Sequence, residues 1–150
     1  MRAAFVTGRM LFGGFFAWSG LNHFLSAEQL RGYAASKGTP KPELAVLGSG
    51  ALIVAGGLSV MTGIKPRRGL AAILAFLVPV SFQMHRFWAV EDPVQRQLEL
   101  VNFMKNMALA GAALMMMQLP EPWPASLPVL QEREEMYVRL GGRDLQALPA

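Results

Sequence analysis

The amino-acid sequence predicts an all-α fold: an integral membrane four-helix bundle with a short surface helix in the first connection and an extramembrane C-terminal tail. The composition supports this in two ways. Of the 150 residues, 53% are hydrophobic and only 16% are charged, whereas soluble domains average about 45–50% apolar and about 25% charged residues. The apolar residues also stand in long blocks, as membrane-spanning helices require. The chain has room for one domain.

Four apolar blocks define the predicted spans. Leu44–Ile64 has 21 residues and no formal charge, which meets the about 20 residues needed to cross a bilayer. Met10–Leu25, Gly69–Met84 and Asn106–Leu119 reach that length only if their polar flanks are helical too, so the last helix should start near Leu98. A water-soluble bundle would need a polar stripe along every block, and Leu44–Ile64 has none.

The first connection, Ser26–Glu43, is predicted to begin with a helix that lies on the membrane surface. Ser26 can cap that helix, and Gln29 stands at the reciprocal position of a capping box. Gly38 supplies a stop signal. We therefore expect a short helix over about residues 27–37.

The C-terminal part differs in composition from the bundle. We place the membrane domain at residues 1–119 and an extramembrane tail at residues 120–150. Trp123, within a proline-rich stretch, is expected to anchor the chain at the membrane interface. Residues 131–140 are expected to form a second surface helix, which Gly141 ends.

Charge and cysteine content limit the function. The net charge is +4 and there is no cysteine. The absence of cysteine excludes disulfides, thiolate metal sites and iron–sulfur clusters carried by this chain. A basic excess in an apolar chain indicates loops that face anionic lipid rather than nucleic acid. The short basic turn Lys65–Arg68 favours cytoplasmic termini by the positive-inside rule.

Polar residues gather toward one end of three predicted spans. Helix periodicity and alternating spans should bring eight of them together in one leaflet, beneath the Ser26–Glu43 connection: Ser19, Asn22, His23, His85, Glu99, Asn102, Lys105 and Asn106. We expect Glu99 to pair with Lys105 or Arg86. We also expect Asn102 and Asn106 to hydrogen-bond the two histidines.

Several interpretations of this polar cluster remain open. It can be a ligand or partner site, or it can be interhelical hydrogen bonding, which contributes about 0.6 kcal/mol per bond. His23, His85 and Glu99 also make a ligand set known for metals, although we assign no metal site and no catalytic residue. Two histidines on different spans allow axial ligation of haem, which no other feature supports. Transport of a substrate is a further interpretation, but four spans without internal symmetry are few for the alternating-access mechanism of transporters.

Six segments resemble the DoxX family in their residues, order and spacing. They fall within about residues 5–118: Gly8–Gly14, Ser19–Phe24, Tyr33–Pro40, Gly56–Ser59, His85–Trp88 and Asn102–Asn106. The resemblance implies a small four-helix protein of the bacterial inner membrane. It does not extend into the tail beyond Pro120.

The resemblance also implies an association with redox complexes. Related proteins include DoxD-like small subunits of thiosulfate:quinone oxidoreductase, and another member is reported to scaffold soluble enzymes at the membrane. We therefore expect a membrane subunit or scaffold of a redox complex, with soluble or membrane redox partner proteins or further copies of itself as partners. The alternatives are a subunit that binds quinone through its histidine and asparagine side chains, or a membrane protein that binds a small molecule or metal.

Overall fold

The computed structural model describes residues 2–127, which form four long helices and two short ones. The helices are α1 (Arg2–Leu25), α2 (Ala27–Ser36), α3 (Pro42–Thr62), α4 (Pro66–Met84), the 3-10 helix η1 (Phe87–Ala89) and α5 (Pro93–Met117). No strand occurs within residues 2–127. The predicted all-α fold is confirmed, and so is the short helix in the first connection. The helix predicted for residues 131–140 lies outside the described part of the chain.

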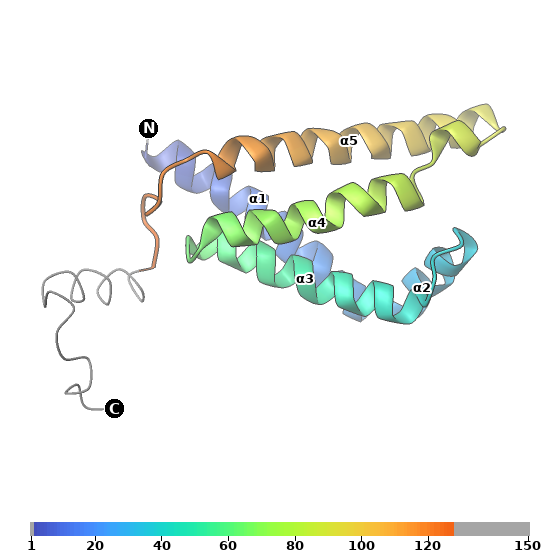
Figure 1. The fold of residues 1–150 in the computed structure, drawn as a ribbon, viewed down its shortest axis with the longest axis horizontal. Coiled ribbons are helices and arrows are strands. Elements are labelled where there is room, and N and C mark those ends of the chain that lie inside the picture. Colours follow the sequence, from blue (N-terminus) through green and yellow to red (C-terminus); the bar gives the residue numbers. More distant parts are fainter. Residues whose placement is uncertain (1, 128–150) are drawn as a thin grey trace, which may run out of the picture.

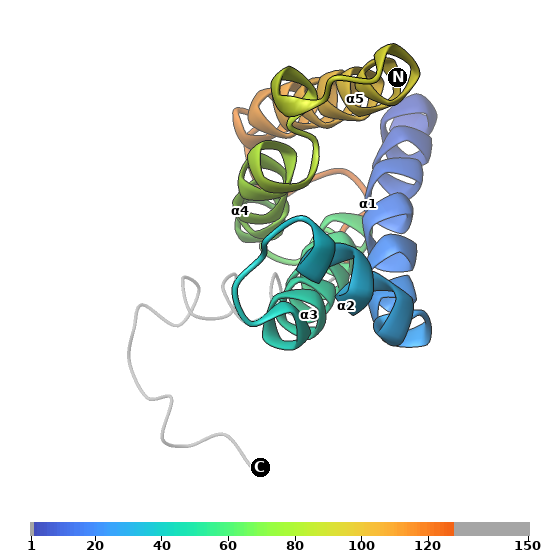
Figure 2. The same cartoon turned by 90° about the vertical axis from the view of Figure 1, so that its right-hand side faces the viewer.

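The long helices pack in the order of the chain. Each of α1, α3, α4 and α5 lies against the next, and α2 folds over one end of α3. α1 lies behind α3 and α4 in the view of Figure 1, and the end-on view of Figure 2 shows it on the opposite side of the molecule from α4. The N-terminus and the α3–α4 turn lie at one end of the bundle, here called the terminal end. The other end, formed by α2 and η1, is called the α2 end.

Three helical segments are long and apolar enough to cross a bilayer: Pro42–Thr62, Pro66–Ala89 and Pro93–Met117. α1 has sufficient length with 24 residues but is not one of these three segments. Its outward face is nevertheless apolar, since Leu11 is 71% exposed and Trp18 is 65% exposed. That pattern suits contact with lipid, so α1 is the fourth span of the bundle.

Glycines allow α1 and α3 to pack closely. A Cβ atom at Gly57 would lie 2.5 Å from the backbone oxygen of Gly13, and one at Gly20 would lie 2.6 Å from the oxygen of Gly50. Small residues commonly allow such close approach between membrane helices. Gly48 and Gly111 differ, because a Cβ at either position would meet no atom within 4 Å. Close helix approach therefore does not require glycine at these two positions.

The segment after α5 closes the terminal end of the bundle. Trp123 is only 2% exposed, and its ring packs edge-on against Phe5 at 5.5 Å between centroids. Arg9, 4% exposed, donates from Nη1 and Nη2 to the carbonyls of Pro124 and Ala125, both at 3.0 Å. Trp123 is therefore part of the core, and its predicted role as an interface anchor is wrong. A tryptophan among prolines is typical of a segment at the membrane interface. Here the proline-rich segment turns back over the bundle instead, and it carries the indole into the core.

Replacing Trp123 should destabilise the bundle. Deleting a buried tryptophan side chain costs about 3–5 kcal/mol, so Trp123→Ala should lower the thermal unfolding temperature of the detergent-purified protein markedly. Trp18→Ala, which removes an exposed tryptophan, is the matched control and should change that temperature little. Equal shifts for the two variants would contradict the buried position of Trp123.

Candidate functional site

A buried carboxylate organises the polar groups at the α2 end. Glu99 lies in the second turn of α5, and the residue is 2% exposed. Its Oε1 accepts a hydrogen bond from Lys37 Nζ at 2.6 Å, and its Oε2 lies 2.8 Å from His85 Nδ1. Gln95 Nε2 adds a longer contact to Oε1, at 3.4 Å. The carboxylate is thus enclosed by donors from three different parts of the chain.

Lys37 ties the end of α2 to the other helices. It is the C-cap residue of α2, and its carbonyl accepts hydrogen bonds from Gln83 Nε2 and Arg86 Nη2, both at 3.0 Å. Its side chain reaches Glu99 from the same position. The expected pairing of Glu99 with Lys105 or Arg86 is therefore wrong, because the loop residue Lys37 occupies the carboxylate and Arg86 bonds the backbone of Lys37 instead.

The bond to Glu99 also affects the charge of Lys37. The hydrogen bond to the carboxylate is the main cause that raises the pKa of Lys37 above its ordinary value of 10.5. A raised pKa in the folded state means that the pair contributes its full stability below the ordinary pKa, and that this contribution disappears only as pH rises through the raised value. The ammonium is therefore present throughout the physiological range.

The two histidines use the same ring nitrogen for structural bonds. His23 Nδ1 lies 3.1 Å from the Val46 carbonyl and 3.0 Å from Ser49 Oγ. Because a carbonyl only accepts, this contact assigns the hydrogen to Nδ1. The carboxylate of Glu99 assigns it likewise to Nδ1 of His85. Within residues 2–127 no hydrogen bond involves Nε2 of either histidine, so both Nε2 atoms are available to a ligand.

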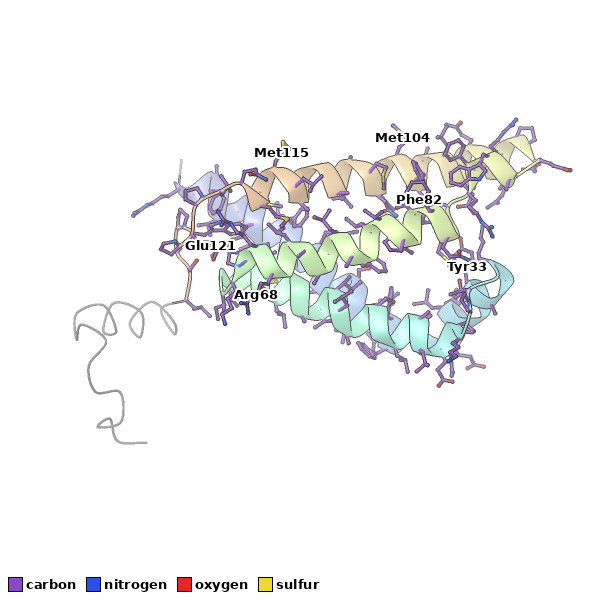
Figure 3. All side chains as sticks on the ribbon, in the orientation of Figure 1. Tyr33, Arg68, Phe82, Met104, Met115 and Glu121 are labelled. Carbon is purple, nitrogen blue, oxygen red and sulfur yellow. The ribbon has the colours of Figure 1, made fainter. Side chains whose placement is uncertain are left out.

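Both histidines line one pocket between α2, α3 and α4. Its volume is about 500 Å³, which lies within the range of about 300–1,000 Å³ typical of small-molecule sites. Its walls are mostly aliphatic, and Phe76 and Tyr33 add aromatic rings. Tyr33 lies on α2, at the end where α3 and α4 diverge (Figure 3). Pro79, within α4, also lines the pocket.

The eight residues of the predicted polar cluster do not form one group. His23 and His85 line the pocket, and Glu99 lies behind His85. Asn22 instead accepts from Ser26 at 3.1 Å, and Lys105 donates to Asn102 at 3.2 Å. Ser19 and Asn106 do not line the pocket, although Asn106 is buried. The expected bonds from Asn102 and Asn106 to the histidines are wrong, because Ser49, the Val46 carbonyl and Glu99 bond the imidazoles.

The pocket and the carboxylate cluster include residues that were not singled out from the sequence. These are Tyr33, Lys37, Ser49, Gln83 and Gln95. Helix spacing offers a signal for Ser49, which stands on the same face of α3 as Val46. It offers none for Lys37, because that residue lies beyond the last turn of a surface helix.

The alternative of a metal site has no support in the geometry. Among the described residues, no three histidine, aspartate or glutamate side chains come together in an arrangement that could hold a metal ion. The set His23, His85 and Glu99 is not assembled, because His23 Nδ1 bonds to α3 and Glu99 bonds to His85 and Lys37.

Removing either partner of the Lys37–Glu99 pair should destabilise the protein. Breaking a buried pair costs about 3–5 kcal/mol, and the cost here should fall at the lower end because the Lys37 side chain is 23% exposed. Glu99→Gln and Lys37→Met should each lower the unfolding temperature, and the double variant should lose less than the sum of the two. The double-mutant cycle is measured by thermal unfolding in detergent.

The pair Arg31–Glu43 provides the control. Its side chains are 38% and 63% exposed, and such surface pairs contribute about 0–1 kcal/mol. Arg31→Met should therefore have a small effect. Strict additivity of the Lys37 and Glu99 substitutions would show that the two groups are not coupled.

Comparison with known proteins agrees with the fold. The model of the DoxX family matches residues 4–86, more than half of the chain. The match contains the first four of the six resembling segments in full, ends within His85–Trp88, and does not reach Asn102–Asn106. No curated protein and no solved structure matches the chain. The extent of the family match, over a chain that folds as an all-α membrane bundle, shows that this protein belongs to the DoxX family.

Proposed function

We propose that this protein is a membrane subunit of a redox complex and that its pocket binds a quinone or the corresponding quinol. The observation that carries the proposal is the pair of histidines in one apolar pocket, each with Nδ1 engaged and Nε2 available. A quinone ring is apolar and flat, with a polar oxygen at each of two opposite edges. An apolar pocket with two imidazoles on its wall suits both properties.

The surroundings of His85 favour the exchange of a proton with such a ligand. A neutral imidazole with its hydrogen on Nδ1 can accept the hydroxyl proton of a quinol at Nε2. Glu99, bonded to the same ring at 2.8 Å, stabilises the positive charge that this transfer creates. In the opposite direction, a protonated His85 can donate to a quinone oxygen. Among the described residues His23 has no carboxylate partner, and it is suited to positioning by hydrogen bonding.

A second candidate function is that of a scaffold without a ligand. Exposed aromatic side chains favour it: Phe82 and Trp88 are 52% and 53% exposed, and they pack around Phe103 where α4, η1 and α5 meet. Met104 lies on the adjoining face of α5 (Figure 3). Such a patch can take a partner protein or sit at the membrane interface. The scaffold requires co-purifying proteins but no bound quinone, which separates it from the first proposal.

We further propose that the protein resides in a bacterial inner membrane with both ends of the chain in the cytoplasm. The terminal end carries the exposed basic turn Lys65–Arg68, and cytoplasmic loops are enriched in such residues. Arg31 and Lys37, at the α2 end, are each paired with a glutamate, Glu43 and Glu99 respectively. At the terminal end Arg67 lies 3.8 Å from Glu121, whereas within residues 2–127 no ion pair is formed by Lys65 or Arg68, so the short basic turn is what supports this orientation.

Binding of menadione tests the quinone proposal. The full chain in lipid nanodiscs should retain menadione above the level of empty nanodiscs. His85→Ala and His23→Ala should each weaken this binding by about 2–10-fold, which corresponds to the loss of one hydrogen bond of about 0.5–1.5 kcal/mol. Lys105→Ala, an exposed control outside the pocket, should bind as the unmodified protein does. Equal binding by all variants would contradict the assignment of the histidines.

Reporter fusions test the orientation. A fluorescent protein fused after Ala150 should be fluorescent, and alkaline phosphatase at the same position should be inactive, because the junction is expected in the cytoplasm. Replacing the three basic residues of Lys65–Arg68 with glutamine should weaken this preference. Active phosphatase in the unmodified fusion would reverse the proposed orientation.

A further inference from the structure

The pocket has exposed lining residues on two of the helices that are long and apolar enough to cross a membrane. Apart from Tyr33 on α2, its exposed lining residues come from the outer faces of two membrane-spanning helices: Leu44, Gly48 and Leu52 from α3, and Ala75 and Pro79 from α4. We call these five residues the mouth. In Figure 1 α1 lies behind α3 and α4, and it contributes His23 to the pocket wall.

The side of the pocket at the α2 end is lined by α2 and the residues that follow it. Tyr33, Ala34 and Thr39 line it there, where Ala34 is 4% exposed and Tyr33, at the outer edge, is 40% exposed. The bond from Lys37 to Glu99 and the bonds to the Lys37 carbonyl hold this end of α2 in place. A ligand therefore meets polar groups and a fixed cover at the α2 end, and an apolar opening between the helices.

The depth of the mouth places it among the acyl chains. At about 1.5 Å per residue, Gly48 lies about 9 Å and Leu52 about 15 Å from the start of α3 at Pro42. The hydrocarbon core of a bilayer is about 30 Å thick. The mouth thus extends from the α2 end to about the middle of the membrane.

Gly48 keeps this opening wide. Glycine within a helix costs about 1 kcal/mol relative to alanine, and the neighbouring Gly50 is explained by the His23 Cβ atom 2.7 Å from where its own Cβ would be. At Gly48 no atom lies within 4 Å of that position, so helix packing does not require glycine there. Gly111 is equally free of neighbours but lies outside the pocket, and so only Gly48 affects the mouth.

We propose that the mouth admits a ligand directly from the bilayer and accommodates its long isoprenoid tail, so that the substrate is a prenylated quinone and not a compact, tail-free one. The inference rests on the proposed quinone function. The ring lies beside His23 and His85, and the tail passes between Gly48 and Ala75 into the lipid. The tail thereby remains in an apolar medium and leaves no polar group unpaired.

Two quinones that share one ring distinguish tail from ring recognition. Menadione and a long-chain menaquinone carry the same methylnaphthoquinone ring, and only the second has an isoprenoid tail. Retention of each is measured on the full chain in washed nanodiscs, relative to empty nanodiscs, as affinity per mole of lipid. The unmodified protein should bind the menaquinone more tightly than menadione.

Side chains placed in the mouth should block the tail selectively. Gly48→Phe should weaken the binding of the menaquinone by about tenfold, a factor that corresponds to about 1.4 kcal/mol, and should leave the binding of menadione nearly unchanged. Ala75→Phe, from the opposite rim, should act in the same way and serves if the first variant does not insert. Gly111→Phe, outside the pocket, is the matched control and should bind as the unmodified protein does.

The outcomes separate the mouth from the quinone site itself. If Gly48→Phe and Ala75→Phe leave menaquinone binding unchanged, or weaken the binding of both quinones equally, the proposal that the tail passes through the mouth is wrong. The proposed quinone site beside the histidines is not contradicted by that result. If the unmodified protein binds menadione as tightly as the menaquinone, tail recognition is wrong. If it retains neither quinone, the proposed function itself fails.

Discussion

The α2 end of this protein depends on one buried charge. The carboxylate of Glu99 lies inside an apolar bundle, where an unpaired charge is costly. Lys37 and His85 satisfy it at 2.6 Å and 2.8 Å. Because one partner belongs to the surface helix and the other to the end of α4, the same bonds that stabilise the charge also fix the cover of the pocket and orient one of its imidazoles. Removing the Glu99 charge would therefore alter both the position of α2 over the pocket and the orientation of the His85 imidazole.

Much of this architecture could be predicted from periodicity and block length. The spans, the surface helix near residues 27–37 and the burial of Glu99 and Asn106 on one face of α5 all follow from local rules. Asn102 and Lys105 show the limit of those rules, since both were placed with the cluster and instead bond each other away from the pocket. Helix spacing says which residues share a face, but not which neighbouring helix that face meets.

The partners of the polar residues could not be predicted because they come from distant positions or from loops. Lys37 stands 62 residues from Glu99 and lies at the end of a short helix whose exact docking no local pattern determines. Ser49 stands 26 residues from His23, and its hydroxyl was one of several on the apolar spans. Trp123 was misplaced for a related reason, because a tryptophan among prolines suits an interface equally well until the fold shows the chain turning back.

The burial of Arg9 has a consequence for the order in which the chain can assemble. Its two carbonyl partners, those of Pro124 and Ala125, lie 115 and 116 residues further along the chain. During synthesis the first helix emerges long before those carbonyls exist, and its guanidinium must keep its water until they arrive. The packing of the first helix to be synthesised is therefore completed by a segment synthesised after all the long helices. A chain that ended with α5 would lack the Pro124 and Ala125 carbonyls and would leave the Arg9 guanidinium exposed, whereas Arg9 is buried in the folded protein.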